Sequence, residues 1–595
     1  MGAAIGDCGA FGRSNVYYGM MRLSSAALIS LAAGWSGCAT RNVHETPPLV
    51  ERLSADDKVV PHELVVDFRD DEPHQTIAEL GRRLGVTFRP VSDFFDTDEI
   101  YTVESDDPEA LLAGLRADPD VEAADFNVLY SIPQGEQAMF ADDPSTENQG
   151  FPNDPKFKYQ WHLEQIHVKQ AWKFAQGAGV TVAVIDTGVA RVPDLAETEI
   201  VAGYNFVDNN KNAADDHGHG THVAGTIAQS TNNGVGVAGI AFKAKIMPIK
   251  VLSARGSGSI GGIAEGIRFA ADHGAKVINM SLGGPLSSSV LGKAIKYAHD
   301  KGVVVVCAAG NDGRGRVSFP AAFPDAIAVA ATQFDESTTF YSNWGKEIDI
   351  AAPGGNTRVD QNGDGMNDGV LQNTIVPGDI SKNDYLLFMG TSMAAPHVAG
   401  VAALLVSQGV TSPDAVEKVL KASAHAPKIK PKDDANRYGA GILDAGAALK
   451  KAQVEYGAEE LGLSALAFGA IALLLRRRAL FALGFGGVTA MLIAASGLFF
   501  APSLGFASHG LAAFGDGNPI FASALIPLAC VALFYSVRTL RGVLAGLAIG
   551  FGGHLLFEIF SRTTGVRFVP DFLDGAWLTA NAALSFALGY ATLRR

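Results

Sequence analysis

Four short apolar segments in the middle of the chain set the strongest limit on its fold. They cover residues 182–185, 244–251, 277–282 and 303–308 and are rich in Val, Ile and Ala. Such segments are typical of strands in a parallel sheet that is buried on both faces. Segments with helical spacing separate them, so we expect an α/β fold with helices on both faces of a parallel sheet.

Polar residues follow three of these predicted strands. Asp186 ends the first, Ser281 lies at the end of the third, and Asn311 follows the fourth. Open parallel sheets bind their ligands at the carboxyl ends of the strands. We therefore expect these three side chains to share one edge of the sheet.

Ser392 follows Gly390 and opens a helical segment rich in Ala, Gly and Val, so its hydroxyl is expected at a helix N-terminus. A serine hydroxyl becomes a good nucleophile only beside an imidazole that a carboxylate orients. Asp186 and His219 lie upstream in the order Asp, His, Ser, which is one of the chain orders known for such triads.

Three blocks carry a resemblance to a known family. Asp-Thr-Gly at 186–188, His-Gly-Thr-His at 219–222 and Gly-Thr-Ser-Met-Ala at 390–394 resemble the signatures of the subtilisin-like serine proteases, closest to the thermitase branch. The resemblance covers about residues 150–450. It implies that Ser392 is the nucleophile, His219 the general base and acid, and Asp186 the residue that orients the imidazole.

The same resemblance makes Asn311 an oxyanion donor, together with the Ser392 amide. The alternative is that none of these residues is catalytic: Asp186 ends a strand, Ser392 caps a helix, and the histidines are loop residues or metal ligands. His217, His219 and His222 lack the His-Glu-x-x-His spacing of many catalytic zinc sites. We expect His222 to be structural and His217 to lie near the substrate cleft.

Residues 281–283 match the family segment whose backbone pairs with an extended substrate. Ser281, Leu282 and Gly283 are therefore expected to bind a peptide by β-augmentation. By resemblance, Ser318 lies near the floor of the S1 pocket. A small residue there leaves room for a medium or large apolar P1 side chain.

Two stretches are candidates for calcium, and no organic cofactor is expected. By resemblance, a family calcium site would use Asp154, Asp194, Thr231, Asn233, Val235 and Val237. In the second stretch Asp360, Asn362 and Asp364, followed by Gly365, reproduce the start of an EF-hand loop, but Leu371 replaces the bidentate Glu. A polar surface loop is the alternative there.

The first 38 residues predict an export signal. Arg22 precedes the apolar residues 23–33, and the ending at Cys38 resembles a bacterial lipobox, so either lipidation or plain signal cleavage is expected. Residues 39–59 form a linker. The formal net charge of -15 argues against nucleic acid as a partner. The four cysteines are scattered, and no disulfide is expected.

Residues 60–133 alternate predicted strands and helices in a way that suits a ferredoxin-like α+β sandwich. Its position before the protease-like region makes it similar to the inhibitory propeptide of the family, and an accessory domain is the alternative. Residues 134–152 would be the processing linker, with maturation before Asn153. Residues 153–450 would form the protease domain.

The last part of the chain, residues 451–595, predicts an all-α transmembrane region. Five apolar segments of roughly spanning length occur there: 461–475, 479–501, 519–537, 543–561 and 576–593. In a five-span arrangement seven arginines fall on one side against Arg562 and Arg567 on the other, which puts the seven in the cytoplasm. A soluble helical domain is the alternative.

Within the fourth segment, His554 and Glu558 are one helical turn apart, and ionisable residues in a span are functional candidates. The whole sequence predicts a serine endopeptidase that is exported, self-processing and anchored in the lipid bilayer of a bacterial cell membrane. Its protease domain would face the periplasm or the exterior and act on peptides or proteins. The alternative function is a catalytically silent peptide-binding module that docks in a membrane assembly.

Overall fold

The computed structural model describes residues 59–69, 73–92, 100–133, 135–139, 150–428, 436–475, 478–495, 523–561 and 573–594. All of them belong to one compact unit, Asp56–Arg595. The predicted export signal and all but the last residue of the linker at 39–59 lie outside the described residues.

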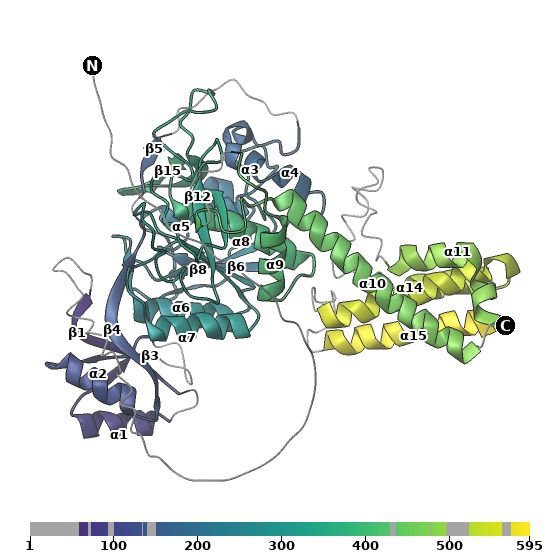
Figure 1. Ribbon diagram of the computed structural model, residues 1–595, viewed down its shortest axis with the longest axis horizontal. Helices are drawn as coiled ribbons and strands as arrows, with labels where there is room; N and C mark the ends of the chain where they lie inside the picture. Colours follow the sequence, from purple (N-terminus) through teal and green to yellow (C-terminus); the bar gives the residue numbers. More distant parts are fainter. Residues whose placement is uncertain are drawn as a thin grey trace, which may run out of the picture. The chain divides into compact units, whose positions relative to one another are not determined.

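A seven-stranded sheet forms the centre of the catalytic region (Figure 1). All of its neighbouring strands run parallel. In spatial order they are β13 (Ile350–Pro353), β12 (Ile327–Thr332), β11 (Val304–Ala308), β10 (Val277–Met280), β6 (Thr181–Asp186), β8 (Lys245–Lys250) and β7 (Tyr204–Asn205). The four apolar segments of the sequence are thus four adjacent strands, β11, β10, β6 and β8.

Helices cover both faces of this sheet because successive side chains of each strand point to opposite sides. Val182 and Val184 of β6 join one core with α5 (His219–Ala228) and α8 (Thr391–Ser407). Ile185, the next residue of the same strand, points to the opposite face, where it lies against Gly266 of α6 (Ile260–Asp272). Helix α7 (Ser289–Asp300) packs beside α6, and α9 (Pro413–Ser423) packs against α8. Every residue of α8 is buried, which its Ala, Gly and Val content permits.

An antiparallel hairpin leads into the nucleophile helix. It consists of β14 (Val370–Val376) and β15 (Asp379–Phe388), and β5 (Gln137–Met139) pairs with β15. Residues 137–139, inside the predicted linker 134–152, form a strand of this small sheet that the sequence did not predict. Three residues are too few to give a periodic signal, and the pairing partner is far away in the sequence.

The N-terminal unit has the element order β–α–β–β–α–β. Its elements are β1 (Val59–Phe68), α1 (His74–Leu84), β2 (Phe88–Pro90), β3 (Ile100–Glu104), α2 (Pro108–Ala117) and β4 (Val121–Ser131). The sheet order is β2-β3-β1-β4, with β9 (Ser257–Ser259) of the catalytic region added beside β4. Helix α2 begins where Asp107 accepts a hydrogen bond from the Ala110 amide at 3.1 Å. The sequence did not predict β2.

The described residues of the C-terminal part form helices joined by short turns. It contains α10 (Ala445–Leu475), α11 (Arg478–Ala495), α13 (Leu525–Phe534), α14 (Arg541–Ser561) and α15 (Asp574–Arg594). The expected boundary at 450 falls inside α10. Asp444 accepts from the Ala447 amide at 2.8 Å, which starts the helix at the end of the catalytic region, and no proline interrupts it.

Each of the five apolar segments lies at least partly in one of these helices. The end of 479–501 and the start of 519–537 fall outside the described residues. Among the residues that are described, Arg538–Phe557 is the one stretch with both the length and the mean hydropathy of a membrane span. His554 and Glu558 both lie in α14.

Candidate active site

Asp186 and His219 meet at the carboxyl edge of the sheet. Asp186 is the last residue of β6 and His219 the first residue of α5, and both are buried. The His219 Nδ1 and Asp186 Oδ1 atoms are 2.8 Å apart. The same oxygen accepts from the Thr187 amide at 2.7 Å. This carboxylate therefore favours the tautomer with a proton on Nδ1, which leaves Nε2 as a base.

Ser392 lies in the first turn of α8 and bonds to the neighbouring strand end. Its hydroxyl donates to the Ser281 carbonyl at 3.2 Å, and the Ser281 hydroxyl donates to the Ser392 carbonyl at 2.8 Å. Within the described residues, His219 Nε2 has no hydrogen-bond partner. The structure thus gives the Asp–His contact but not a Ser–His hydrogen bond. Such bonds often tighten only when substrate is bound.

The Asn311 side chain is fixed from the nucleophile helix. Its Oδ1 accepts from the Thr391 amide at 2.9 Å and from the Thr391 hydroxyl at 2.7 Å. Its Nδ2 donates to the carbonyl of Pro133 at 3.4 Å. The amide group is therefore oriented by α8 and directed at a peptide carbonyl.

That carbonyl belongs to a segment that lies extended across the site. Ser131 exchanges two backbone hydrogen bonds with Gly283, of 3.1 and 2.9 Å, and Ile132 donates to the Gly256 carbonyl at 2.9 Å. On its other side, β4 pairs antiparallel with β9. The end of β4 is thus held between two backbone edges, and Gly283 pairs with Ser131 of the chain itself.

Tyr130 anchors the same segment. Its side chain is fully buried, and its hydroxyl donates to the Leu286 carbonyl. A Cβ atom on Gly284 would come within 2.5 Å of its ring, so glycine is needed for the ring to fit.

The two other expected cleft residues are buried, Leu282 completely and Ser318 almost so. The Ser318 hydroxyl accepts from Asn343 Nδ2 at 3.3 Å.

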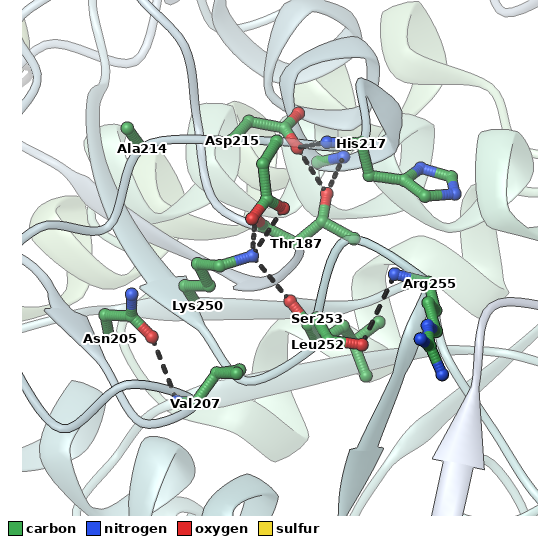
Figure 2. Close-up of polar contacts among 12 residues, drawn as sticks. Thr187, Asn205, Val207, Ala214, Asp215, His217, Lys250, Leu252, Ser253 and Arg255 are labelled. Carbon is green, nitrogen blue, oxygen red and sulfur yellow. Dashed lines mark hydrogen bonds and ion pairs between the residues drawn. The ribbon is translucent and has the colours of Figure 1, made fainter. Parts of the chain in front are cut away.

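Asp215 is a site residue that the sequence analysis missed (Figure 2). Its Oδ1 accepts from the Thr187 hydroxyl at 2.8 Å and from the amides of His217 and Gly218 at 2.9 and 3.0 Å. Its Oδ2 accepts from the amide and hydroxyl of Thr221 at 2.9 and 2.6 Å. Asp215 therefore ties the first turn of α5 to the residue that follows Asp186. The sequence signal that could have identified Asp215 was its position four residues before His219.

Lys250 is the second missed residue, and it lies directly under this network (Figure 2). It pairs in register with Asp186 across β6 and β8 and is 2% exposed. Its ammonium donates to Asp216 Oδ1 at 2.7 Å and to the carbonyls of Thr187 and Leu252 at 2.9 and 2.8 Å. All three N–H donors of the ammonium group therefore have an acceptor. The buried positive charge offsets the negative charge of the neighbouring carboxylates.

Three other histidines are buried around the catalytic helices. His222 Nε2 bonds the carbonyls of Val370 and Leu386 at 3.0 and 3.2 Å, which links α5 to the hairpin. Burial lowers the pKa of His222 to about 3. His162, in α3 (Trp161–Gln165), contacts His397 of α8 at 2.7 Å, and burial lowers the pKa of both, that of His397 to about 4.

His217 lies beside Gly256, since a Cβ atom on Gly256 would come within 3.5 Å of its Nε2.

The expected calcium residues form a loop around two buried carboxylates. Asp154 accepts from the amides of Asn232 and Asn233, and Asp194 accepts from the Val237 amide at 2.9 Å and from Asn233 Nδ2 at 3.2 Å. Burial raises the pKa of Asp194 to about 7. Neither carboxylate forms an ion pair with a described residue, and their oxygen donors suit a hard cation.

The remaining expected members of that loop are peripheral. Thr231 donates its hydroxyl to the Gln229 carbonyl, and Val235 is exposed. No group of three or more His, Cys, Asp or Glu side chains in the described parts of the chain has the arrangement of a metal site.

Comparison with known proteins gives matches to two family models. The subtilase family matches residues 177–441, and a domain of unknown function (DUF5942) matches residues 499–595. The chain is 44% identical over 260 residues to thermitase from Thermoactinomyces vulgaris, which covers 43% of this chain and 86% of thermitase. It is 35% identical to the thermophilic serine proteinase of Bacillus sp. (strain AK1), over 66% of this chain and 90% of that protein.

Among solved structures, fervidolysin from Fervidobacterium pennivorans, a keratinolytic enzyme related to subtilisin, matches with a TM-score of 0.53. The two are 25% identical, and the match covers 67% of this chain and 62% of fervidolysin.

Proposed function

Because this chain belongs to the subtilase family and is a thermitase-like serine endopeptidase, we propose that it is made as a self-processing zymogen and works on the outer side of a membrane. In the proposed reaction Ser392 attacks a peptide carbonyl and forms an acyl-enzyme. His219 takes the serine proton and returns it to the leaving amine, Asp186 stabilises the imidazolium, and water then hydrolyses the ester. Asn311 and the Ser392 amide would stabilise the oxyanion.

The contact between Asn311 Nδ2 and the Pro133 carbonyl carries the zymogen proposal. In the proposed reaction, a donor of the oxyanion hole binds the oxygen of the carbonyl group whose carbon the serine attacks. The pairing of Ser131 with Gly283 supports the same arrangement, because an extended substrate would use the same backbone groups. Residues 60–133 would then be a ferredoxin-like inhibitor whose last strand fills the cleft, and the first cut would follow Pro133.

The full chain and its Ser392→Ala variant test this proposal. The wild-type chain should lose its N-terminal unit and then hydrolyse peptides. N-terminal sequencing should find a new end at residue 134, with later trimming toward Asn153. Ser392→Ala should keep the unit and cleave nothing. A variant that matures like wild type would contradict self-processing and would mean that another protease makes the cut.

Calcium would bind where the carboxylates of Asp154 and Asp194 meet Asn233. The support is chemical, because two buried carboxylates without a cationic neighbour among the described residues are costly unless a cation compensates them. The ion would join the loop to the N-terminal end of the catalytic domain and stabilise the fold. It would take no part in the reaction.

The C-terminal helices would anchor the enzyme in the bilayer. This proposal is supported by the exposure of large apolar side chains on these helices. Leu466, Leu473 and Phe485 are 73 to 89% exposed. Surfaces of this kind are unusual in water and typical of contact with lipid. The arginine distribution would place the catalytic domain outside the cytoplasm, on the side where secreted subtilases act. A single span through Arg538–Phe557 is the smaller form of this proposal.

A further inference from the structure

Asp368, between the catalytic sheet and the hairpin, is a buried carboxylate with one unused oxygen. It is completely buried, and its Oδ2 accepts from the Gln361 amide at 2.6 Å. Its Oδ1 has no hydrogen-bond donor, and no described residue forms an ion pair with the side chain. A buried carboxylate left in this state is costly unless a proton or a cation compensates it.

The residues before Asp368 have the spacing of a cation-binding loop. Asp360, Asn362 and Asp364 occupy positions one, three and five, and Gly365, with φ of 87°, occupies position six. In such loops the backbone carbonyl at position seven and the residue at position nine also face the ion. These are Met366 and Asp368. Asp368 therefore offers an acidic oxygen that Leu371, at position twelve, does not.

The carboxylates of Asp360 and Asp364 accept hydrogen bonds from amides of the loop itself. The carboxylate of Asp360 now accepts from the amides of Gly363 and Gly365 at 2.7 and 3.1 Å. Asp360 and Asp364 are exposed, so rotation of their side chains toward Asp368 requires no repacking.

We propose that residues 360–368 bind one calcium ion through the side chains of Asp360, Asn362, Asp364 and Asp368 and the carbonyl of Met366. Calcium is favoured over zinc because every donor is a hard oxygen, and over magnesium because the loop can adjust to more than six ligands. This site is separate from the loop around Asp194.

The bound ion would stiffen the base of the hairpin. Asp368 bonds the backbone of Val359 and Asn356, each at 2.7 Å. The next residue, Gly369, accepts from the Trp161 indole at 3.1 Å, and Val370 accepts from His222 on the helix that begins with His219. Holding Asp368 therefore holds a segment that packs against the catalytic helix α5.

Calcium titration of the full chain tests the proposal. The Ser392→Ala background prevents self-digestion, and chelator-treated protein is titrated calorimetrically with calcium. Asp368→Asn should bind one equivalent less than its parent. Asp364→Asn, at an exposed position that leaves the fold intact, should lose the same equivalent or bind it much more weakly. Asp335→Asn is the matched control, because Asp335 contacts the Gln361 side chain from outside the loop and should change nothing.

A spectroscopic readout makes the location specific. Terbium bound at this loop lies near the Trp161 indole, so excitation of tryptophan should give terbium emission that Asp364→Asn removes. Asp194→Asn, in contrast, should leave that emission in place. Unchanged stoichiometry and emission in both loop variants would overturn the proposal, as would an equal loss in Asp335→Asn.

Discussion

At the scale of single residues, the catalytic geometry depends on groups that never touch substrate. Asp215 is the main example, because its five hydrogen bonds join Thr187 to the first turn of α5. Lys250 holds Thr187 from the other side. Asp186 and His219 stand at the ends of two different elements, so their contact is only as rigid as this connection.

Replacing Asp215 with Asn should therefore lower kcat/KM without removing any group that reacts. An amide keeps the size of the side chain but cannot accept at both ends, so the start of α5 should shift. A misplacement of about 1 Å can cost about 100-fold, and we expect a loss of about 10- to 100-fold. Rates are measured on mature enzyme whose active sites have been counted by titration.

The matched control is Asp208→Asn, because Asp208 is an exposed carboxylate in the neighbouring loop. This variant should retain the parent rate. The pH profile of Asp215→Asn should also move, because the imidazole loses part of its support. A rate and a profile identical to those of the parent would show that the network is not needed to position His219.

At the scale of elements, β4 and the hairpin β14–β15 approach the active site from opposite ends of the sequence. Strand β4 brings Tyr130 into a buried position over Gly284. The hairpin brings the carbonyls that bind His222. The proposed inhibition of the site and its structural support thus depend on separate elements, which can be changed separately.

Tyr130→Ala should weaken the hold of the N-terminal unit after cleavage. Truncation of a buried aromatic residue costs about 3–5 kcal/mol, which corresponds to a loss of affinity of about 100-fold or more. The cleaved unit should therefore co-purify with wild-type enzyme but separate from the variant. Tyr130→Phe, which loses only the hydroxyl bond to Leu286, should remain bound. Gly284→Ala, which blocks the same space from the other side, should behave like Tyr130→Ala.

The buried histidines between helices predict acid sensitivity. His162, His222 and His397 have pKa values depressed by burial, so the folded protein keeps them neutral while the unfolded chain binds protons below about pH 6.5. Their contribution to stability is complete above that pH and is lost as the pH falls. The loss is about 1.4 kcal/mol per pH unit for each histidine until its folded pKa is reached.

The measurement is the thermal midpoint of Ser392→Ala at fixed saturating calcium, followed by tryptophan fluorescence from pH 7 to pH 5. The midpoint should fall, and His162→Gln should make the fall shallower, because glutamine binds no proton. An equally steep fall in the variant would show that His162 does not contribute.

At the scale of the whole molecule, catalytic and C-terminal parts are joined through one helix. The first residues of α10 belong to the catalytic core, where Ala445, Ala448 and Leu449 are buried. Later in the same helix, Leu466 and Leu473 are exposed. One continuous helix therefore connects the core of the protease to the proposed anchor.

The full chain should sediment with membranes and resist extraction at alkaline pH. A chain that ends at residue 460 keeps the buried start of α10 and should be recovered in the soluble fraction. The same shortened chain with Ser392 restored should keep full peptidase activity. Recovery of the full chain in the soluble fraction, like the shortened chain, would contradict anchoring by the C-terminal helices. Both chains carry Ser392→Ala in the fractionation, so that proteolysis cannot release the catalytic domain.

The sequence determined the α/β fold and predicted which groups are catalytic, because local patterns carry both. Apolar segments of strand length predicted four neighbouring strands of the parallel sheet, and short motifs singled out Asp186, His219, Asn311 and Ser392. Helix α10 could not be bounded in this way, since a helix that passes from a protein core to an apolar surface shows no local break.

Only the tertiary structure decided what these groups contact. The bonds of Asp215 to Thr187, of Lys250 to Asp216, and of Asn311 to Pro133 join residues between 28 and 178 positions apart. The buried oxygen of Asp368 without a hydrogen-bond donor was also not visible in the sequence, because burial depends on the packing of distant segments. Side-chain partners and burial arise from chain closure over long separations, and no local pattern records them.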